Sequence, residues 1–236
     1  MTTERDLPLS EFLQYLAREN GDGDRLHSLV IISQQLGVGI ASLREQLEVA
    51  RAFGLVDVRP KTGIRRLPYQ FTPAVVKSLA YATAIDGLYF FSAFADLRTH
   101  IEAAYWRQAV SLLTPEDHQQ LIDLIARAMD KLNGEPIHLP HSEHRELHLS
   151  IYSRLNNPFV TGILEAYWEA YEAVGLNMYT DIRYLMNVWE YHRQMVEAIC
   201  SGDIESGYRA LVEHTDLLLQ RSEPSPKPAS SLQDRA

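Results

Sequence analysis

Residues 36–67 read LGVGIASLREQLEVARAFGLVDVRPKTGIRRL, and their pattern changes from helical to alternating within this single stretch. Residues 41–53 form a predicted helix, because apolar side chains recur at helical spacing at Leu43, Leu47, Val49 and Ala50. Gly54 follows as a plausible C-cap, since glycine accepts the left-handed conformation that ends many helices. The centre of the stretch is therefore a capped helix of about three turns.

A short hairpin is predicted directly after this helix. Residues 55–59 alternate between apolar and polar side chains, residues 60–63 (PKTG) are typical of a turn, and residues 64–67 provide the returning strand. Upstream, two further helices are predicted over residues 8–20 and 28–36; the first has one apolar face of Phe12, Leu13 and Leu16. Helix, helix, tight connection, helix and hairpin is the order of a winged helix-turn-helix.

The rest of the chain contains no convincing strand pattern. Helices are predicted over residues 72–86, 87–113, 115–133, 141–155, 158–177, 181–200 and 203–221. The Pro- and Ser-rich end is predicted to be disordered. The predicted fold class is thus mainly α. Its predicted domains are a winged helix-turn-helix over 1–68, an all-helical bundle over 69–222 for effector binding and dimerisation, and a disordered tail over 223–236. Residues 68–72 form the predicted hinge between the domains.

The net charge of −9 is unevenly distributed. Residues 1–68 carry nine basic and nine acidic side chains, so all of the negative charge lies in residues 69–236. This asymmetry is compatible with a DNA-binding N-terminal part on an acidic body. No apolar run approaches the roughly 18 residues of a membrane span, the N-terminus has no apolar signal core, and the single cysteine, Cys200, excludes an internal disulfide. We therefore expect a cytoplasmic protein without membrane contact.

Several segments in order resemble one known family. Residues 36–67 resemble the winged helix of the GntR superfamily. The segments LRTHIEA (97–103), HRELHLSIYSRLNNP (144–158), EYHRQMVEAICSGD (190–203) and LVEH (211–214) resemble the all-helical ligand-binding domain, called FCD, of its FadR subfamily. The resemblance covers nearly the whole chain. It implies a ligand-responsive, DNA-binding transcription regulator.

The resemblance also implies which residues approach DNA. The helix that starts near residue 41 is its recognition helix, with Arg44 at a guanine edge or a phosphate and Ser42 near a phosphate. Lys61, Thr62 and Gly63 match the residues of the wing that approach the minor groove. Many relatives have arginines where this chain has Ile40 and near Val30. The alternative role of Arg44 is a surface ion pair with Glu48, four residues later.

Four of the nine histidines are arranged for a common site. His144 and His148 are four residues apart, so their rings project from the same helical face. His192 and His214 flank the turn at Gly202, about 15 and 18 Å from it along two antiparallel helices, and therefore lie at similar depth. Such a set can hold one metal ion, although a histidine pair alone is more often surface or core structure.

The family resemblance favours the metal interpretation. The metal-binding branch of this domain uses an Asp-x3-His pair with two later histidines, and His148, His192 and His214 match three of these positions. His144 stands in place of the aspartate. An all-histidine set has one negative charge fewer and favours zinc or nickel over manganese. We expect a divalent metal ion and no organic cofactor.

Arg98 is the predicted effector-binding residue, because it matches a family arginine that faces the ligand cavity. A guanidinium can bind a carboxylate with two parallel hydrogen bonds, so a small hydroxy acid or sugar acid is the expected ligand. The alternative is an ion pair with Glu102 within the same helix. The aromatic stripe of Tyr167, Trp168 and Tyr171 is more typical of a core.

Together these features predict a homodimer that binds a palindromic operator on double-stranded DNA, as a repressor whose affinity is modulated by a small carboxylate metabolite. Two alternatives stay open. One is a metal-dependent enzyme that uses the same histidines, although the chain lacks an HExxH motif and a glutamate-rich di-iron set. The other is a regulator whose effector cavity contains no metal.

Overall fold

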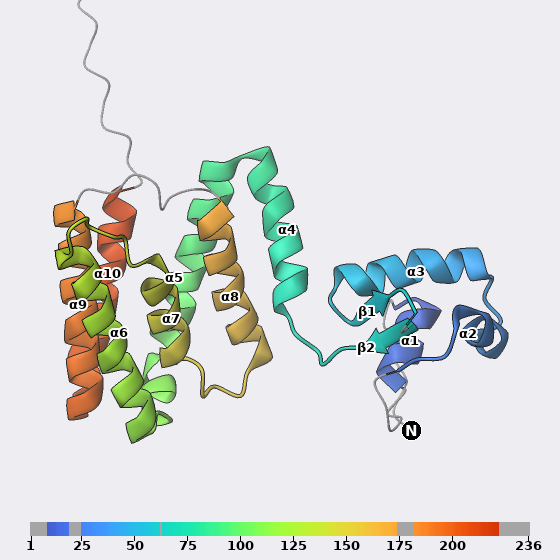
Figure 1. Ribbon diagram of the computed structural model, residues 1–236, viewed down its shortest axis with the longest axis horizontal. Coiled ribbons are helices and arrows are strands. Elements are labelled where there is room, and N and C mark those ends of the chain that lie inside the picture. The colour runs from blue at the N-terminus through green and yellow to red at the C-terminus, as the bar shows by residue number, and fades with distance from the viewer. Residues whose placement is uncertain (1–8, 19–24, 62, 174–181, 222–236) are drawn as a thin grey trace, which may run out of the picture. The chain divides into compact units, whose positions relative to one another are not determined.

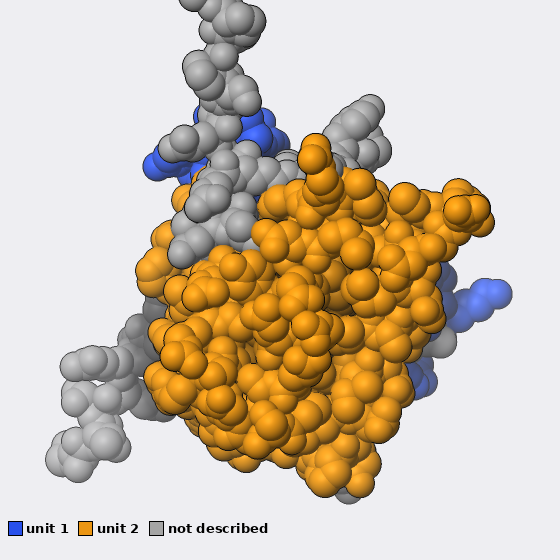
Figure 2. All heavy atoms as spheres, turned by 90° about the vertical axis from the view of Figure 1, so that its left-hand side faces the viewer, with its two compact units in different colours: residues 1–91, 156–174 blue, residues 92–155, 175–236 orange. Residues whose placement is uncertain are grey.

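The computed structural model describes residues 9–18, 25–61, 63–173 and 182–221, with side chains up to residue 214. The chain divides into two compact units, coloured separately in Figure 2. The first comprises residues 1–91 and 156–174, and the second comprises residues 92–155 and 175–236. The predicted domain boundary at residue 68 stays a prediction, and the predicted tail lies outside the described residues.

The winged helix-turn-helix forms the N-terminal part of the first unit (Figure 1). Its elements are α1 (Glu11–Arg18), α2 (Leu29–Leu36), α3 (Ile40–Ala52), β1 (Val56–Arg59) and β2 (Gly63–Arg66). The two strands are antiparallel with Val58 opposite Ile64, and Leu26 donates its backbone N–H to Ile64 at 2.9 Å. The core contains Phe12, Leu16, Ile32, Leu43, Leu47, Ala50, Val56 and Ile64.

The end of α3 shows how its sequence stops the helix. Gly54 has φ +68°, and the N–H of Leu55 returns to the carbonyl of Ala50 at 2.9 Å, which is the bonding pattern of a Schellman motif. Gly54 therefore ends the helix as predicted, one residue beyond the cap residue Phe53. Val49 was expected on the apolar face but is 45% exposed, because it lies about 100° around the helix from Ala50.

The first unit also contains α4 (Thr72–Ile85) and α8 (Pro158–Ala173), which pack side by side. The Thr72 hydroxyl donates a hydrogen bond to Glu165. Tyr167 and Trp168 are buried, and Tyr167 stacks on Phe91 with 5.4 Å between ring centroids. The aromatic stripe therefore contributes to the core of this unit.

The second unit is built from helices only in its described residues. It contains most of α5 (Gly87–Ser111), with α6 (Pro115–Asn133), α7 (His141–Ile151), α9 (Ile182–Ser201) and α10 (Ile204–Arg221). α9 packs against α10 and α6, and α6 packs against α7 (Figure 1). The predicted fold class, mainly α with a winged helix-turn-helix, is confirmed. No helix among the described residues has the length and apolar character needed to cross a membrane.

α7 is shorter than predicted. The helical pattern extended to residue 155, but α7 ends at Ile151. The Tyr152 hydroxyl donates to the backbone carbonyl of Glu102 at 2.9 Å, and Arg154 bonds both carboxylate oxygens of Asp117 at 2.9 and 3.0 Å. These tertiary contacts hold residues 152–154 outside the helix, which local propensity cannot anticipate.

Candidate functional site

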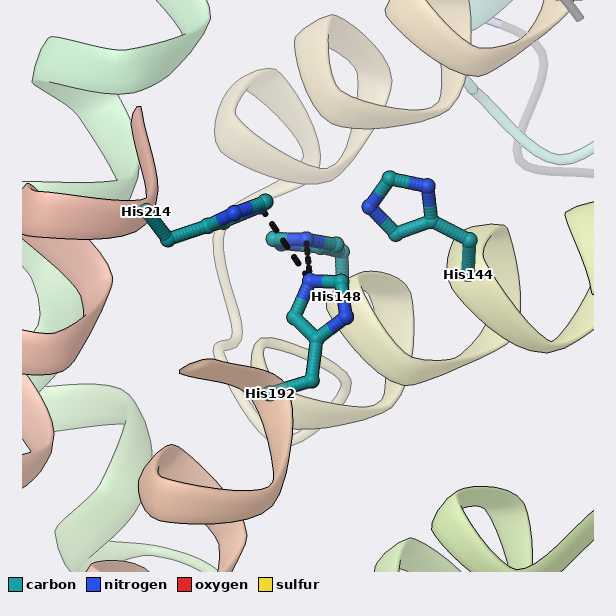
Figure 3. Close-up of side chains that lie close together, drawn as sticks. All are labelled: His144, His148, His192 and His214. Atoms are coloured by element: carbon teal, nitrogen blue, oxygen red, sulfur yellow. Dashed lines mark hydrogen bonds between the residues drawn. The ribbon is translucent and has the colours of Figure 1, made fainter. Parts of the chain in front are cut away.

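Four histidines from three helices converge in the second unit (Figure 3). His144 and His148 come from α7, His192 from α9 and His214 from α10, and one potential ligand nitrogen of each lies within 4.8 Å of the others. His148, His192 and His214 are fully buried, whereas His144 is half-buried. The structure thus brings together all four histidines that the sequence singles out.

Local sequence explains this convergence. α7 presents His144 and His148 one turn apart. Gly202, with φ +78°, reverses the chain between α9 and α10, and Asp203 starts α10 by accepting the N–H of Ser206 at 3.1 Å. The two antiparallel helices place His192 and His214 at the same depth, with their Nε2 atoms 3.1 Å apart.

The distances within the cluster fit a metal site. The Nε2 atom of His192 lies 3.2 Å from that of His148 and 3.1 Å from that of His214. Two nitrogens that are each about 2.1 Å from one metal ion are about 3.4 Å apart at a tetrahedral angle and about 3.0 Å apart at a right angle. The Nε2 atom of His192 therefore already has the spacing of a fellow metal ligand to the Nε2 atoms of both His148 and His214.

The protonation of the cluster also suits a metal. Burial lowers the pKa of all four imidazoles well below the usual value, because the interior disfavours the charged form. The nearby Arg98 guanidinium adds to this lowering for His148. Neutral imidazole is the form that ligates zinc and other divalent ions.

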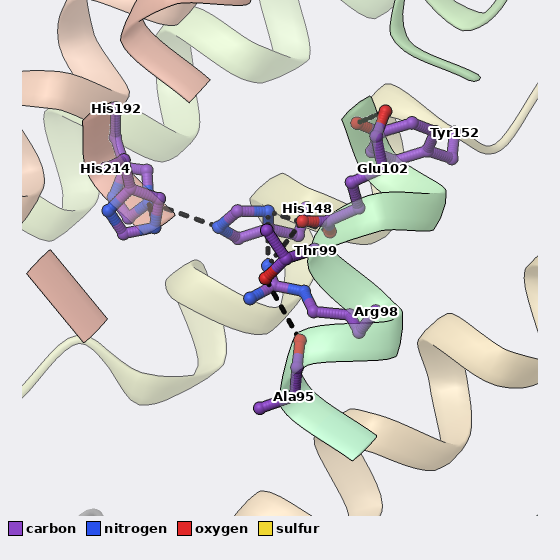
Figure 4. A network of polar contacts seen from close by, with 8 residues as sticks. All are labelled: Ala95, Arg98, Thr99, Glu102, His148, Tyr152, His192 and His214. Carbon is purple, nitrogen blue, oxygen red and sulfur yellow. Dashed lines mark hydrogen bonds and ion pairs between the residues drawn. The ribbon is translucent and has the colours of Figure 1, made fainter. Parts of the chain in front are cut away.

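Arg98, the predicted effector residue, is buried beside this cluster (Figure 4). Its Nη2 atom lies 2.9 Å from Glu102 Oε2 and 2.8 Å from His148 Nδ1. The ion pair with Glu102, left open by the sequence, is therefore present. It does not test the effector role, which stays a proposal.

Glu102 is the site residue that sequence reasoning missed. It is completely buried, and its Oε1 atom lies 3.1 Å from His148 Nδ1. Burial raises the pKa of this carboxyl, and the charge of Arg98 opposes the rise. The sequence showed only its spacing from Arg98; its contact with a histidine 46 positions away depends on how α5 meets α7.

The predicted DNA-binding residues lie on α3 and at the turn of the hairpin. Ser42 and Arg44 are exposed, and Glu48 pairs with Arg51 at 2.8 Å. Glu48, the expected alternative partner of Arg44, is thus bonded to Arg51 instead. No ion pair of Arg44 is found among the described residues. Gly39, the N-cap of α3, makes no side-chain cap hydrogen bond. The first N–H groups of the helix therefore have no side-chain acceptor there.

Of the predicted wing residues, Lys61 follows the end of β1 and Gly63 is the first residue of β2. Lys61 is exposed with φ 70°, and Gly63 has φ 83°, so both adopt the left-handed conformation that tight turns use. Thr62 lies outside the described residues. Ile40, where the family resemblance leads us to expect arginine, and Val30, near the second such position, are 37% and 52% exposed.

Comparisons with known proteins identify the family of this chain. Residues 93–217, more than half of the chain, match the model of the FCD domain. The chain belongs to the GntR family, in its FadR-like, FCD-containing branch. The matched residues include Arg98, Glu102 and the four histidines.

Individual relatives are distant. NedR of Micromonospora viridifaciens, whose assignment is that of a transcriptional regulatory protein, is 23% identical over 117 residues, which are 46% of this chain and 78% of NedR. Streptococcus agalactiae GntR is 18% identical with a TM-score of 0.64, over 89% of this chain and 95% of that chain. E. coli McbR/YncC is 20% identical with a TM-score of 0.50, over 91% and 97%. At these identities the structures show the fold alone.

The family makes this chain a transcription regulator with an FCD effector-binding domain. Regulators of this family bind DNA and effector ligands, and they are not normally enzymes. The family assignment does not decide four further points, which stay predictions: the symmetry of the operator, the carboxylate effector, the bound metal and the homodimer.

Proposed function

We propose that this chain is a metal-dependent repressor whose affinity for a palindromic operator changes when a small carboxylate binds its FCD domain. His144, His148, His192 and His214 would hold one divalent metal ion, with zinc or nickel preferred. Arg98 would bind the carboxylate. Ser42, Arg44, Lys61, Thr62 and Gly63 of each protomer of a homodimer would contact DNA.

The convergence of four neutral histidines carries the metal part of this proposal. The Nε2 atom of His192 lies 3.2 Å from that of His148 and 3.1 Å from that of His214. The ring centroids of His144 and His192 are 4.7 Å apart. Four imidazoles without a carboxylate ligand suit zinc or nickel better than harder ions. A bound metal would supply a Lewis-acid centre for a carboxylate or hydroxyl oxygen.

The charge beside the cluster supports an anionic effector. Arg98 is 1% exposed and cannot lose its proton. Neutral histidines do not offset its charge, and Glu102 is its anionic partner at 2.9 Å. A metal dication added to this arrangement leaves the site positive. A small carboxylate therefore complements it better than a neutral or cationic ligand.

The exposed N-terminal turn of α3 supports the DNA part. The N–H groups that follow Gly39 and the positive end of the helix dipole favour a phosphate. Arg44 lies in the first turns of the same helix and is exposed, and Glu48, its expected surface partner, is bonded to Arg51. Operator binding by two such helices requires a two-fold dimer.

Elemental analysis of the purified chain after zinc loading and dialysis tests the metal centre. We expect about one zinc per chain, loss of that zinc in His192→Ala, and full retention in His100→Ala, which removes a histidine that is 76% exposed on α5. Only trace zinc in the wild-type chain would support the alternative of a metal-free effector cavity. Light scattering of the same samples checks for the homodimer.

A further inference from the structure

One nitrogen at the edge of the histidine cluster has two incompatible neighbours. His148 Nδ1 lies 2.8 Å from Arg98 Nη2 and 3.1 Å from Glu102 Oε1, as Figure 4 shows. A guanidinium only donates hydrogen bonds, and a carboxylate only accepts them. The Nδ1 atom of a neutral imidazole either accepts or donates, so the two contacts require different tautomers.

The other nitrogen of the same ring connects this choice to the cluster. His148 Nε2 lies 3.2 Å from His192 Nε2. When Nδ1 accepts from Arg98, the ring proton is on Nε2 and can be donated to His192. When Nδ1 donates to Glu102, Nε2 carries a lone pair that points at the other histidines. Only the second tautomer is a metal ligand through Nε2.

We propose that Glu102 is a positioning residue that holds His148 in its ligand tautomer, and that Arg98 holds the same ring in the competing, non-ligand tautomer. The inference rests on the proposed metal-dependent function and deepens it. In the exchange Nε2 loses a proton and Nδ1 gains one, so the imidazole stays neutral. Arg98 keeps its contact with Glu102 Oε2 but must turn one N–H away from His148.

Burial makes the choice between tautomers decisive. The side chains of Arg98 and Glu102 are 1% and 0% exposed, and His148 is 0% exposed. Bulk water therefore cannot replace whichever partner the ring does not use, and an unmade hydrogen bond in the interior is costly. The N–H that Arg98 turns away becomes a donor for an incoming carboxylate. Metal binding at His148 Nε2 therefore favours the tautomer that releases an Arg98 N–H, so the His148 ring couples the metal to the effector-binding donor.

Nitrogen NMR of the full chain labelled with ¹⁵N-histidine tests this directly. The protonated and unprotonated ring nitrogens have distinct shifts, and His148→Gln identifies the His148 signals by their loss. We expect Nε2 to carry the proton in metal-stripped chain and Nδ1 to carry it after zinc loading. The same tautomer in both states would overturn the proposal.

Zinc affinity of Glu102→Gln provides the second readout. Loss of a residue that orients a metal-bound histidine typically weakens metal binding by about 10- to 100-fold. Asp96→Asn is the matched control, because it makes the same acid-to-amide change on α5 at a side chain that is 60% exposed. We expect unchanged affinity in the control. Equal zinc affinity of Glu102→Gln and wild type would contradict the role of Glu102.

These outcomes separate the two proposals. A wild-type chain that takes up no zinc would end the proposed metal-dependent function and this inference with it. A chain that takes up about one zinc without a change of His148 tautomer would leave the metal centre intact and refute the inference alone.

Discussion

At the scale of single residues, His144 distinguishes this cluster from the metal-binding branch that it resembles. It occupies the place of an aspartate and is the only half-buried member of the four described histidines. Its ring centroid lies 4.7 Å from that of His192, which is close enough for a common ligand. The proposed site therefore has four nitrogen donors and no ligand carboxylate.

Restoring the carboxylate should change the metal preference. In His144→Asp we expect manganese affinity to rise by about tenfold, or about 1.4 kcal/mol, because a hard oxygen ligand with a negative charge is added. Competition titrations of manganese against zinc measure this. Manganese affinity equal to that of the wild type would show that His144 is not in the ligand set.

Ile40 is the residue at which the proposed DNA-binding helix departs from the family pattern, as His144 does in the proposed metal site. It is the first residue of α3 and is 37% exposed, at the position where the family resemblance leads us to expect arginine. We expect Ile40→Arg to tighten binding to duplex DNA and to steepen its salt dependence by about one phosphate contact. Anisotropy titrations at several salt concentrations give the slope. Val49→Arg, at a side chain that is 45% exposed farther along α3, adds the same single charge and is the control.

At the scale of elements, the sequence predicted most helices to within a few residues. The ends of α6 at Pro115 and Asn133 agree with the prediction, because Thr114, Pro115 and Asp117 form a recognisable helix start. The end of α7 was wrong because Tyr152 and Arg154 are held by α5 and α6. The histidine set could be predicted from spacing, whereas Glu102 could not, because its role depends on packing between helices.

At the start of α6 the Thr114 hydroxyl accepts the N–H of Asp117, and the Asp117 carboxylate accepts the N–H of Thr114, which is a capping box. This capping box leads to a pH prediction. The hydrogen bonds of Arg154, followed by those of Thr114, lower the pKa of Asp117 to about 2, below its ordinary value of 3.8. The folded state therefore prefers the carboxylate, and this stabilisation is present above pH 4 and is lost as the pH falls toward 2. Urea unfolding across this range should show a weaker acid dependence in Asp117→Asn.

Thr114→Ala, which removes the other half of the capping box, should lower the unfolding free energy by about 1 kcal/mol at neutral pH.

The contact between α5 and α10 depends on a glycine. A Cβ atom on Gly207 would lie 2.7 Å from the ring of Trp106, and that ring is held by a 3.0 Å hydrogen bond from its N–H to the carbonyl of Ile204. We expect Gly207→Ala to cost about 1–3 kcal/mol of stability through overpacking. Gly87→Ala, where a Cβ would meet nothing within 4 Å, should be neutral or slightly stabilising. Equal denaturation midpoints for the two variants would contradict this account of the packing.

At the scale of the whole molecule, the sequence carried the two parts of the function on different segments. Residues 36–67 contain the elements proposed to bind DNA, and residues 93–217 contain the FCD domain with every residue of the candidate metal centre. The structure groups α4 and α8 with the N-terminal residues in one compact unit. That grouping was not predictable, because α8 is separated from α4 by more than 70 positions and joins it only through tertiary packing.

Coupling between the two parts is the central claim, and operator binding tests it most directly. An operator is first selected from a random pool of duplex DNA with the full-length chain. Its affinity is then measured by anisotropy for metal-stripped chain, zinc-loaded chain, and zinc-loaded chain with a panel of hydroxy and sugar acids.

The account predicts that at least one acid changes the operator affinity of the zinc-loaded wild type by about 5- to 150-fold, the usual range of allosteric coupling. The same acid should have no effect on metal-stripped chain or on His192→Ala. An effect of equal size with and without zinc would contradict the metal-dependent sensor, and unchanged operator affinity under every condition would contradict the sensor as a whole.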